Sequence, residues 1–281
     1  LIITLYTKIM VYLIYFLCSC LLSYLFFVSY KKIASKFKLI DSKNLHYSHS
    51  PTPTGSGIFF SVYFFIVNLV LYIIYGNNLI LYFFEWPNKF YIFIISGLVL
   101  SIISYFDDIK SIDPILRLLS QIVFVYISIV CLNLENDIFP FKVTILITVG
   151  LWIYLLNLTN FLDGADGFLI TNFLIIILQI LAIYFFFNIT LFSYVISLIL
   201  LPLVLMFLMF NKPPAKLFMG DAGSIFLGFI CGFFFLEFTF SGNMNLAISL
   251  FSYFLVDCTI CIIKKLKKGI KAWIGMYDYY F

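Results

Sequence analysis

Long apolar runs separated by short polar segments dominate the pattern along this 281-residue chain. Several runs reach about 18 to 22 residues, the length that an α-helix needs to cross the hydrocarbon core of a bilayer. A backbone in lipid must satisfy its own hydrogen bonds, and the alternating pattern of a membrane β-barrel is absent from these runs. The pattern therefore predicts an all-α fold, a polytopic membrane helical bundle of about nine to ten transmembrane helices.

We expect spans at residues 9–30, 58–75, 90–106, 117–133, 143–160, 168–187, 191–210, 223–239 and 246–263. The apolar segment 79–86 is too short to cross a bilayer, and its aromatic residues favour the headgroup layer. We expect residues 1–281 to form a single integral-membrane domain.

Composition strengthens this picture, since hydrophobic residues make up 64% of the chain, charged residues 11%, and the mean hydropathy is +1.11. These values exclude a water-soluble domain. The six cysteines lie in or at the ends of apolar runs. We interpret them as small packing residues, because a single CxxC pair lacks the second ligand pair of a zinc site.

Basic residues divide the predicted connections into two classes. When alternate connections are placed on opposite sides, most of the 17 lysine and arginine residues fall on one side. The positive-inside rule makes that side cytoplasmic and places the N-terminus outside. The predicted cytoplasmic segments are 31–57, 107–117, 157–167, 211–222 and the tail 264–281.

The same assignment also sorts the aspartates. Those that fall on the cytoplasmic side are Asp107, Asp108, Asp113, Asp163, Asp166 and Asp221. Three separate helix connections thus bring carboxylates to one surface, which a random scatter of loop charges would not require.

The connection "FDDIKSIDPILRLLSQ" (106–121) contains an adjacent acidic pair. Asp113 is suited to cap the following helix, with Pro114 at its first position. The like charges of Asp107 and Asp108 repel each other unless a cation or basic group compensates them. Solvated loop charges and a metal-binding or proton-accepting pair are both consistent with this segment.

The connection "NLTNFLDGADGF" (157–168) carries two further aspartates. If a helix begins there, Asp163 and Asp166 share one face, and the glycines leave the backbone open to a ligand. Carboxylates and bare amides at a helix N-terminus suit a metal and a phosphate group, and Asn160 adds another polar group. A glycine-rich turn with an aspartate cap is the structural alternative.

The connection "KPPAKLFMGDAGSIFLG" (212–228) repeats this logic, with Asp221 at a helix start and Lys212 and Lys216 before it. A simple N-cap role for Asp221 is the alternative. The first loop ends in "SHSPTPTGSG" (48–57), where His49 taken alone is typical of a loop histidine.

Aspartates from three loops, with few histidines, favour magnesium and phosphates over hydrolytic zinc. Phosphoryl transfer needs mainly positioning and charge neutralisation, which carboxylate-held Mg²⁺ and lysines supply. A site at a membrane surface indicates one lipid substrate and one water-soluble substrate.

These four motifs, in this order and spacing over roughly residues 45–265, resemble those of the polyprenyl-phosphate N-acetylhexosamine-1-phosphate transferases. The resemblance implies transfer of an amino sugar phosphate from a UDP-sugar to undecaprenyl phosphate, with release of UMP. It also implies Mg²⁺, with Mn²⁺ as an alternative, and a site at the cytoplasmic face of the bacterial inner membrane. The implied partners are membrane lipid and the two substrates, with a homodimer as an option and no nucleic acid.

Site residues follow from the resemblance, motif by motif. The implied catalytic residues are Asp107, Asp108, Asp163 and Asp166. The implied metal ligands are Asp221 and Asp108. The implied substrate-binding residues are Asn160, Lys212, Lys216 and His49. Asp107 is the candidate for deprotonating or positioning the lipid phosphate, and both direct attack and a covalent aspartyl intermediate stay open.

The motifs look more like the O-antigen and enterobacterial-antigen enzymes, with UDP-GlcNAc or a related donor, than like phospho-N-acetylmuramoyl-pentapeptide transferase, the alternative. Relatives carry a histidine-rich motif with an arginine after the last span, where this chain reads "MYDYYF" (276–281) and stops. Either the donor-binding end is altered, or the sequence is truncated, or the protein is an inactive member. A membrane transporter is a remote alternative, because no inverted repeat is evident.

Overall fold

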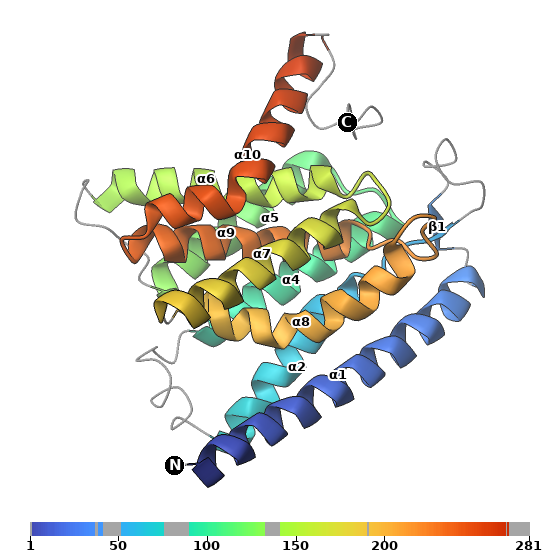
Figure 1. Ribbon diagram of the computed structural model, residues 1–281. Helices are drawn as coiled ribbons and strands as arrows, with labels where there is room; N and C mark the ends of the chain where they lie inside the picture. The colour runs from blue at the N-terminus through green and yellow to red at the C-terminus, as the bar shows by residue number, and fades with distance from the viewer. Residues whose placement is uncertain are drawn as a thin grey trace.

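The structure is a computed structural model that describes residues 2–36, 39–41, 52–75, 90–132, 141–189, 191–267 and 269. Its helices lie side by side in a bundle (Figure 1). They are α1 (Ile2–Lys36), α2 (Ile58–Tyr75), α4 (Phe90–Ile109), α5 (Pro114–Leu132), α6 (Phe141–Leu162), α7 (Phe168–Phe187), α8 (Phe192–Asn211), α9 (Asp221–Phe240) and α10 (Met244–Lys267). Two short strands, β1 (Ile40–Asp41) and β2 (Thr52–Pro53), pair antiparallel with Ile40 opposite Pro53.

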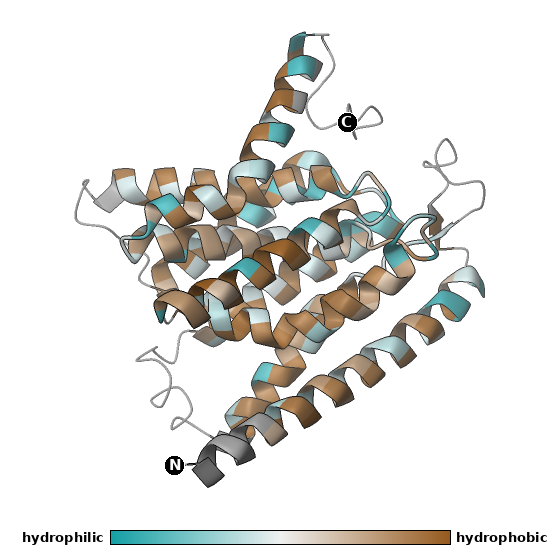
Figure 2. Ribbon diagram, in the orientation of Figure 1, coloured by the Kyte–Doolittle hydropathy of each residue, from teal (hydrophilic) through white to brown (hydrophobic). Residues whose placement is uncertain are grey.

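Hydropathy and length confirm the predicted all-α membrane bundle. Within the described ranges, seven helices are long and apolar enough to cross a membrane, or up to eight if the bent α10 is one span. The apolar part of α2, Ile58–Ile73, is shorter. Segment 79–86 lies outside the described residues. Figure 2 shows apolar residues along the helices and polar residues gathered in the connections at one end of the bundle.

Two helices differ most from the predicted spans. Helix α1 continues past residue 30 to Lys36, because lysine is a good helix former whose long side chain reaches the headgroup layer. Helix α10 bends by 62° between Met244–Tyr253 and Leu255–Lys264, so its second half leaves the bundle (Figure 1).

Helix α9 lies at the centre of the bundle, and every residue from 222 to 238 is buried. Its closest neighbour is α6, which approaches over Gly228 and Gly232. A Cβ atom on Gly228 would lie 2.7 Å from the carbonyl oxygen of Leu156, and one on Gly232 would lie 2.1 Å from Trp152. Small residues four apart allow such close helix packing in membranes, where lipid supplies no hydrophobic drive for association.

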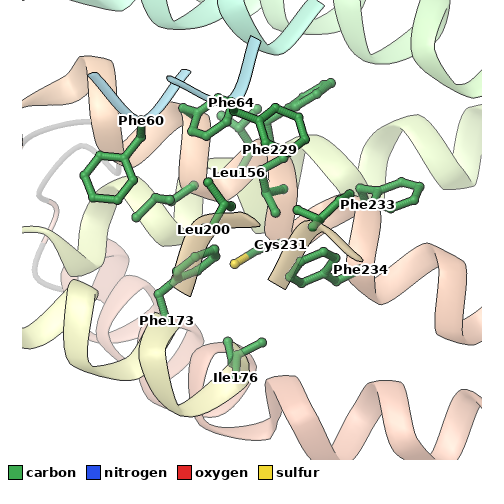
Figure 3. Close-up of a cluster of buried hydrophobic side chains, with 14 of the residues drawn as sticks. Phe60, Phe64, Leu156, Phe173, Ile176, Leu200, Phe229, Cys231, Phe233 and Phe234 are labelled. Atoms are coloured by element: carbon green, nitrogen blue, oxygen red, sulfur yellow. The ribbon is translucent and has the colours of Figure 1, made fainter. Parts of the chain in front are cut away.

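Aromatic side chains fill the space between α9 and its neighbours. The ring centroids of Phe93 and Phe233 are 4.8 Å apart, and those of Trp152 and Phe229 are 5.1 Å apart. Figure 3 shows Phe60 and Phe64 of α2, Phe173 of α7 and Leu156 of α6 around the same core. The tight packing fixes α9 relative to the helices that carry the other acidic connections.

A buried acid also lies near the far end of α9. Glu237 is only 6% exposed and accepts hydrogen bonds from the backbone amides of Phe192 at 2.5 Å and Ser193 at 2.8 Å. These are the first two residues of α8, whose own N-cap residue, Leu191, supplies no side-chain hydrogen bond. Glu237 therefore caps α8 and joins it to α9.

Candidate functional site

Three helix connections meet at one end of the bundle. Asp107 and Asp108 lie in the last turn of α4, before the α4–α5 connection. Asn160 lies at the end of α6, and Asp163 and Asp166 lie in the α6–α7 connection. Lys212 and Lys216 lie in the α8–α9 connection, and Asp221 is the first residue of α9. Hydrogen bonds join the third connection to each of the other two. Of the predicted site residues, His49 lies outside the described residues.

Asp108 caps the N-terminus of α9. Its Oδ1 accepts a hydrogen bond from the amide of Asp221 at 3.0 Å, and its Oδ2 accepts one from the amide of Ala222 at 3.3 Å. The preceding residue, Gly220, has a φ of 76°, and a Cβ atom there would lie 2.5 Å from Asp108 Oδ2. Glycine is thus required both for the backbone and for the approach of Asp108. Both carboxylate oxygens of Asp108 thus face helix amides, and its expected role as a metal ligand stays a prediction.

Arg117 forms ion pairs with both Asp107 and Asp221. Nη1 of Arg117 donates to Oδ2 of Asp107 in a very short contact and to Oδ2 of Asp221 at 2.9 Å. The amide of Ile112 donates to Oδ1 of Asp107 at 2.6 Å. The side chain of Arg117 is 28% exposed, so this ion-pair cluster is partly shielded from water.

Sequence reasoning counted Arg117 only as a topology charge and missed it as a site residue. The available signal was the like-charge pair Asp107 and Asp108, which required a compensating basic group. Arg117 lies in the same motif, in the first turn of α5, whose start is as predicted: Asp113 Oδ1 accepts a hydrogen bond from the amide of Ile115 at 2.7 Å, with Pro114 between them.

Polar side chains of α5, α6 and α9 lie behind the acids. Ser224 Oγ donates to Oδ1 of Asn160 at 2.6 Å, which links the ends of α9 and α6. Nδ2 of Asn157 donates to Oε1 of the buried Gln121 at 2.8 Å, which links α6 to α5. Satisfied polar pairs of this kind fix the register of neighbouring helices in lipid.

Asp163 and Asp166 lie in the turn before α7 rather than on its face, because α7 begins only at Phe168 after Gly167, whose φ is 72°. Oδ2 of Asp166 accepts a hydrogen bond from the amide of Ala215 at 2.8 Å. Asn211 adds a second link between the same two connections, since its Oδ1 accepts from the amide of Gly167 at 3.1 Å. Nδ2 of Asn211 donates to the carbonyl oxygen of Leu217 at 3.0 Å.

A cavity of ≈ 440 Å³ adjoins these links. Its lining includes Asp166, Lys212, Thr171 and Asn172, with the rings of Phe168 and Tyr253 beside them. It therefore offers a carboxylate, a cation, hydrogen-bonding groups and aromatic surface to one ligand.

Residues 52–57, hereafter the first-loop segment, lie against the α8–α9 connection. Ser56 Oγ donates to the carbonyl oxygen of Phe218, and the amide of Gly57 donates to that of Met219, both at 2.8 Å. A Cβ atom on Gly57 would lie 2.3 Å from Cα of Gly223, so the backbones of the segment and of α9 touch. Tyr30 of α1 anchors the segment by donating to the carbonyl oxygen of Thr54 at 2.9 Å.

The carboxylates of this site differ in their fitness to hold a divalent cation. Among the described residues, no group of three or more His, Cys, Asp and Glu side chains is arranged to hold a metal ion. Mg²⁺, however, is usually held by one or two carboxylates together with substrate phosphates. Asp107 and Asp221 fit that requirement, because their Oδ2 atoms converge on the single cationic nitrogen of Arg117.

Proteins of known name are similar to this chain over more than two thirds of its length. A phospho-N-acetylmuramoyl-pentapeptide-transferase from Petrotoga mobilis is 32% identical over 212 residues, which cover 68% of this chain and 62% of the relative. A protein of the same name from Lactococcus lactis is 28% identical over 223 residues, which cover 73% of this chain and 65% of the relative. The chain thus spans less than two thirds of the length of these relatives.

The family profile described as Glycosyl transferase family 4 matches residues 90–239. The match begins at α4 and ends within α9, so it contains the α4–α5, α6–α7 and α8–α9 connections. The chain belongs to glycosyl transferase family 4.

Proposed function

We propose that this protein transfers a sugar 1-phosphate from a UDP-sugar to a polyprenyl phosphate such as undecaprenyl phosphate. The observation that carries the proposal is the meeting of Asp107, Asp108, Asp166 and Asp221 at one end of a membrane-spanning bundle. At such a position a lipid substrate can remain in the bilayer while its phosphate meets a water-soluble donor. Membership of glycosyl transferase family 4 supports the same reaction class.

In the reaction, an oxygen of the lipid phosphate forms a bond to the sugar-bearing phosphorus of the donor. The bond from that phosphorus to the bridging oxygen breaks, and UMP leaves with the bond's electron pair. A phosphate monoester carries a charge of about −1.5 to −2 at pH 7, so most of the nucleophile is already deprotonated. This favours direct attack and gives Asp107, already engaged by Arg117, a role in holding cations rather than accepting a proton.

Asp221 and Asp107 would hold Mg²⁺ or Mn²⁺ together with phosphate oxygens of the substrates. When bound, the ion neutralises the charge that develops on the transferred phosphoryl group. Asp108 supports the site in another way: by capping α9 it holds Asp221 in place.

The cavity beside Asp166 is suited to the donor. Lys212 offers a cation to a phosphate, and the aromatic rings and polar groups of the lining match a nucleoside. Lys216, on the same connection, is exposed and adds a second positive charge to that connection. Asn160 and Asp163 lie at the end of α6 and in the turn that follows.

For the donor, the relatives support the alternative better than the O-antigen type that the motifs favoured. Both relatives described above carry the name phospho-N-acetylmuramoyl-pentapeptide-transferase. UDP-N-acetylmuramoyl-pentapeptide is therefore our preferred donor, and UDP-GlcNAc is the second candidate. The short motif differences that suggested an O-antigen enzyme cover few residues, whereas the similarity to these relatives extends over more than two thirds of the chain.

The basic residues of the connections support a site on the cytoplasmic side of the bacterial inner membrane, by the positive-inside rule. Lys110 lies just after α4 and Arg117 in the first turn of α5, at the same end as the acids, and Lys212 and Lys216 lie there too, in the α8–α9 connection. A UDP-sugar is a cytoplasmic metabolite class, so this orientation agrees with the proposed donor.

The deciding experiment supplies the purified chain, in detergent micelles, with undecaprenyl phosphate, Mg²⁺ and one of the two donors. UMP release and the lipid-linked product are measured, with Asp221→Asn as the inactive control. Product from the pentapeptide donor alone supports the proposal as stated. Product from UDP-GlcNAc alone would restore the O-antigen type, and no product from either would refute the activity.

A further inference from the structure

The contacts of Arg117 differ from those of an ordinary structural ion pair. An arginine normally binds a carboxylate in a bidentate manner, through two parallel N–H groups. Here, within the described part of the chain, the side chain of Arg117 donates from one nitrogen, Nη1, to both Asp107 and Asp221. These acids come from α4 and α9, which are far apart in the sequence. Two carboxylate oxygens thus surround a point of positive charge, as they would surround a metal ion.

The charges of the cluster do not balance. Asp108 is compensated by the N-terminus of α9, through the amides of Asp221 and Ala222. Asp107 and Asp221 share one guanidinium, so one carboxylate charge is left over. A divalent cation between them would neutralise both.

We infer that Arg117 is a built-in counter-cation that occupies the divalent-cation position between Asp107 and Asp221 and is displaced from it when the cation binds. The inference rests on the proposed function, of which it describes the regulation. Nη1 already lies where both acids meet, so the arginine and the cation cannot hold Oδ2 of both residues at once.

Displacement gives Arg117 a second task. Its side chain is 28% exposed and rooted in the first turn of α5, so its planar fork stays beside the site after it leaves the acids. A guanidinium binds phosphate oxygens with two parallel hydrogen bonds. When the cation is bound, the released Arg117 would therefore bind the phosphates of the substrates. When the cation is absent, Arg117 between Asp107 and Asp221 would keep these two carboxylates from repelling each other.

The test measures Mn²⁺ binding to the full chain, by the electron paramagnetic resonance signal of free Mn²⁺. In Arg117→Gln we expect the Kd for Mn²⁺ to fall by about tenfold or more, because a competing charge-assisted contact is lost. Lys110→Gln is the matched control: it removes one exposed cation of the same connection, and screening should limit its effect to about twofold. Unchanged or weaker binding in Arg117→Gln, or equal tightening in both variants, would overturn the inference.

Thermal unfolding supplies a second readout. In EDTA, Arg117→Gln should unfold at a lower temperature than wild type, and saturating Mn²⁺ should restore most of the difference. If Arg117→Gln does not fold, Arg117→Lys keeps the positive charge that competes with the cation, so its Kd for Mn²⁺ should stay near the wild-type value, and a Kd lower by about tenfold would count against displacement. The donor assay separates the two proposals. If Mn²⁺ binds more tightly to Arg117→Gln but the wild-type protein forms no product, the proposed activity alone is refuted. If the wild-type protein forms product but Mn²⁺ does not bind more tightly to Arg117→Gln, the displacement of Arg117 alone is refuted.

Discussion

Replacing Gly57 with alanine should reduce turnover about 100-fold, because a displacement of about 1 Å at a catalytic site costs on that order. The added Cβ atom would lie 2.3 Å from Cα of Gly223 and 2.6 Å from its amide nitrogen, whereas ordinary contacts begin at 3.4 Å. Both atoms are backbone, so no side-chain rotation relieves the contact. The first-loop segment and the first turn of α9 must separate by roughly 1 Å, and that turn carries Asp221.

The assay compares UMP release and thermal unfolding of Gly57→Ala with those of wild type. Overpacking of this kind costs about 1–3 kcal/mol of stability, so most of the variant should still fold. Gly150→Ala is the matched control, because a Cβ atom on this α6 glycine has no neighbour within 4 Å. Turnover of Gly57→Ala within about threefold of wild type would contradict the proposal that contact with the first-loop segment positions Asp221.

Three further substitutions test other contacts. Asp108→Asn replaces one of the two acceptor oxygens with an NH₂ donor that faces an amide of α9. Turnover in the donor assay should therefore fall at least tenfold, which corresponds to about the cost of one unsatisfied polar group. Asn211→Ala removes the partners of Gly167 and Leu217 and should raise the KM for the UDP-sugar more than it lowers kcat, as steady-state kinetics would show. Glu237→Ala should lower the free energy of unfolding by about 1–3 kcal/mol, seen as a lower Tm, while the turnover of folded protein stays unchanged.

Much of the fold could be predicted from the sequence, because the spacing of apolar runs is set by bilayer thickness. The start of α5 at Pro114 and that of α7 at Phe168 follow the predicted cap and glycine signals. The extension of α1 to Lys36 was missed, because hydropathy reports where lipid ends and not where hydrogen bonding ends. The bend in α10 could not be predicted, because the sequence around it, "SYFLVDC" (252–258), contains no proline.

The site was predictable as a set of residues but not as a set of contacts. Adjacent carboxylates in "FDDIK" imply compensation, yet their two compensators differ in kind: Arg117 for Asp107, and backbone amides of α9 for Asp108. Such long-range pairing depends on how α4 and α9 pack, and the spacing of residues along one sequence does not show that packing. The motif of the first-loop segment was identified, but its contacts were not predicted, since Phe218, the partner of Ser56, lies 162 positions away.

The burial of α9 on all sides has a consequence for sequence variation. A helix at the edge of the bundle, such as α1, has one face toward lipid, where Leu13, Leu17 and Leu21 are exposed and can be exchanged for other apolar residues. On α9 no such face exists between residues 222 and 238. A complete substitution scan should therefore show helical periodicity of tolerance in α1 and intolerance around the whole circumference of α9.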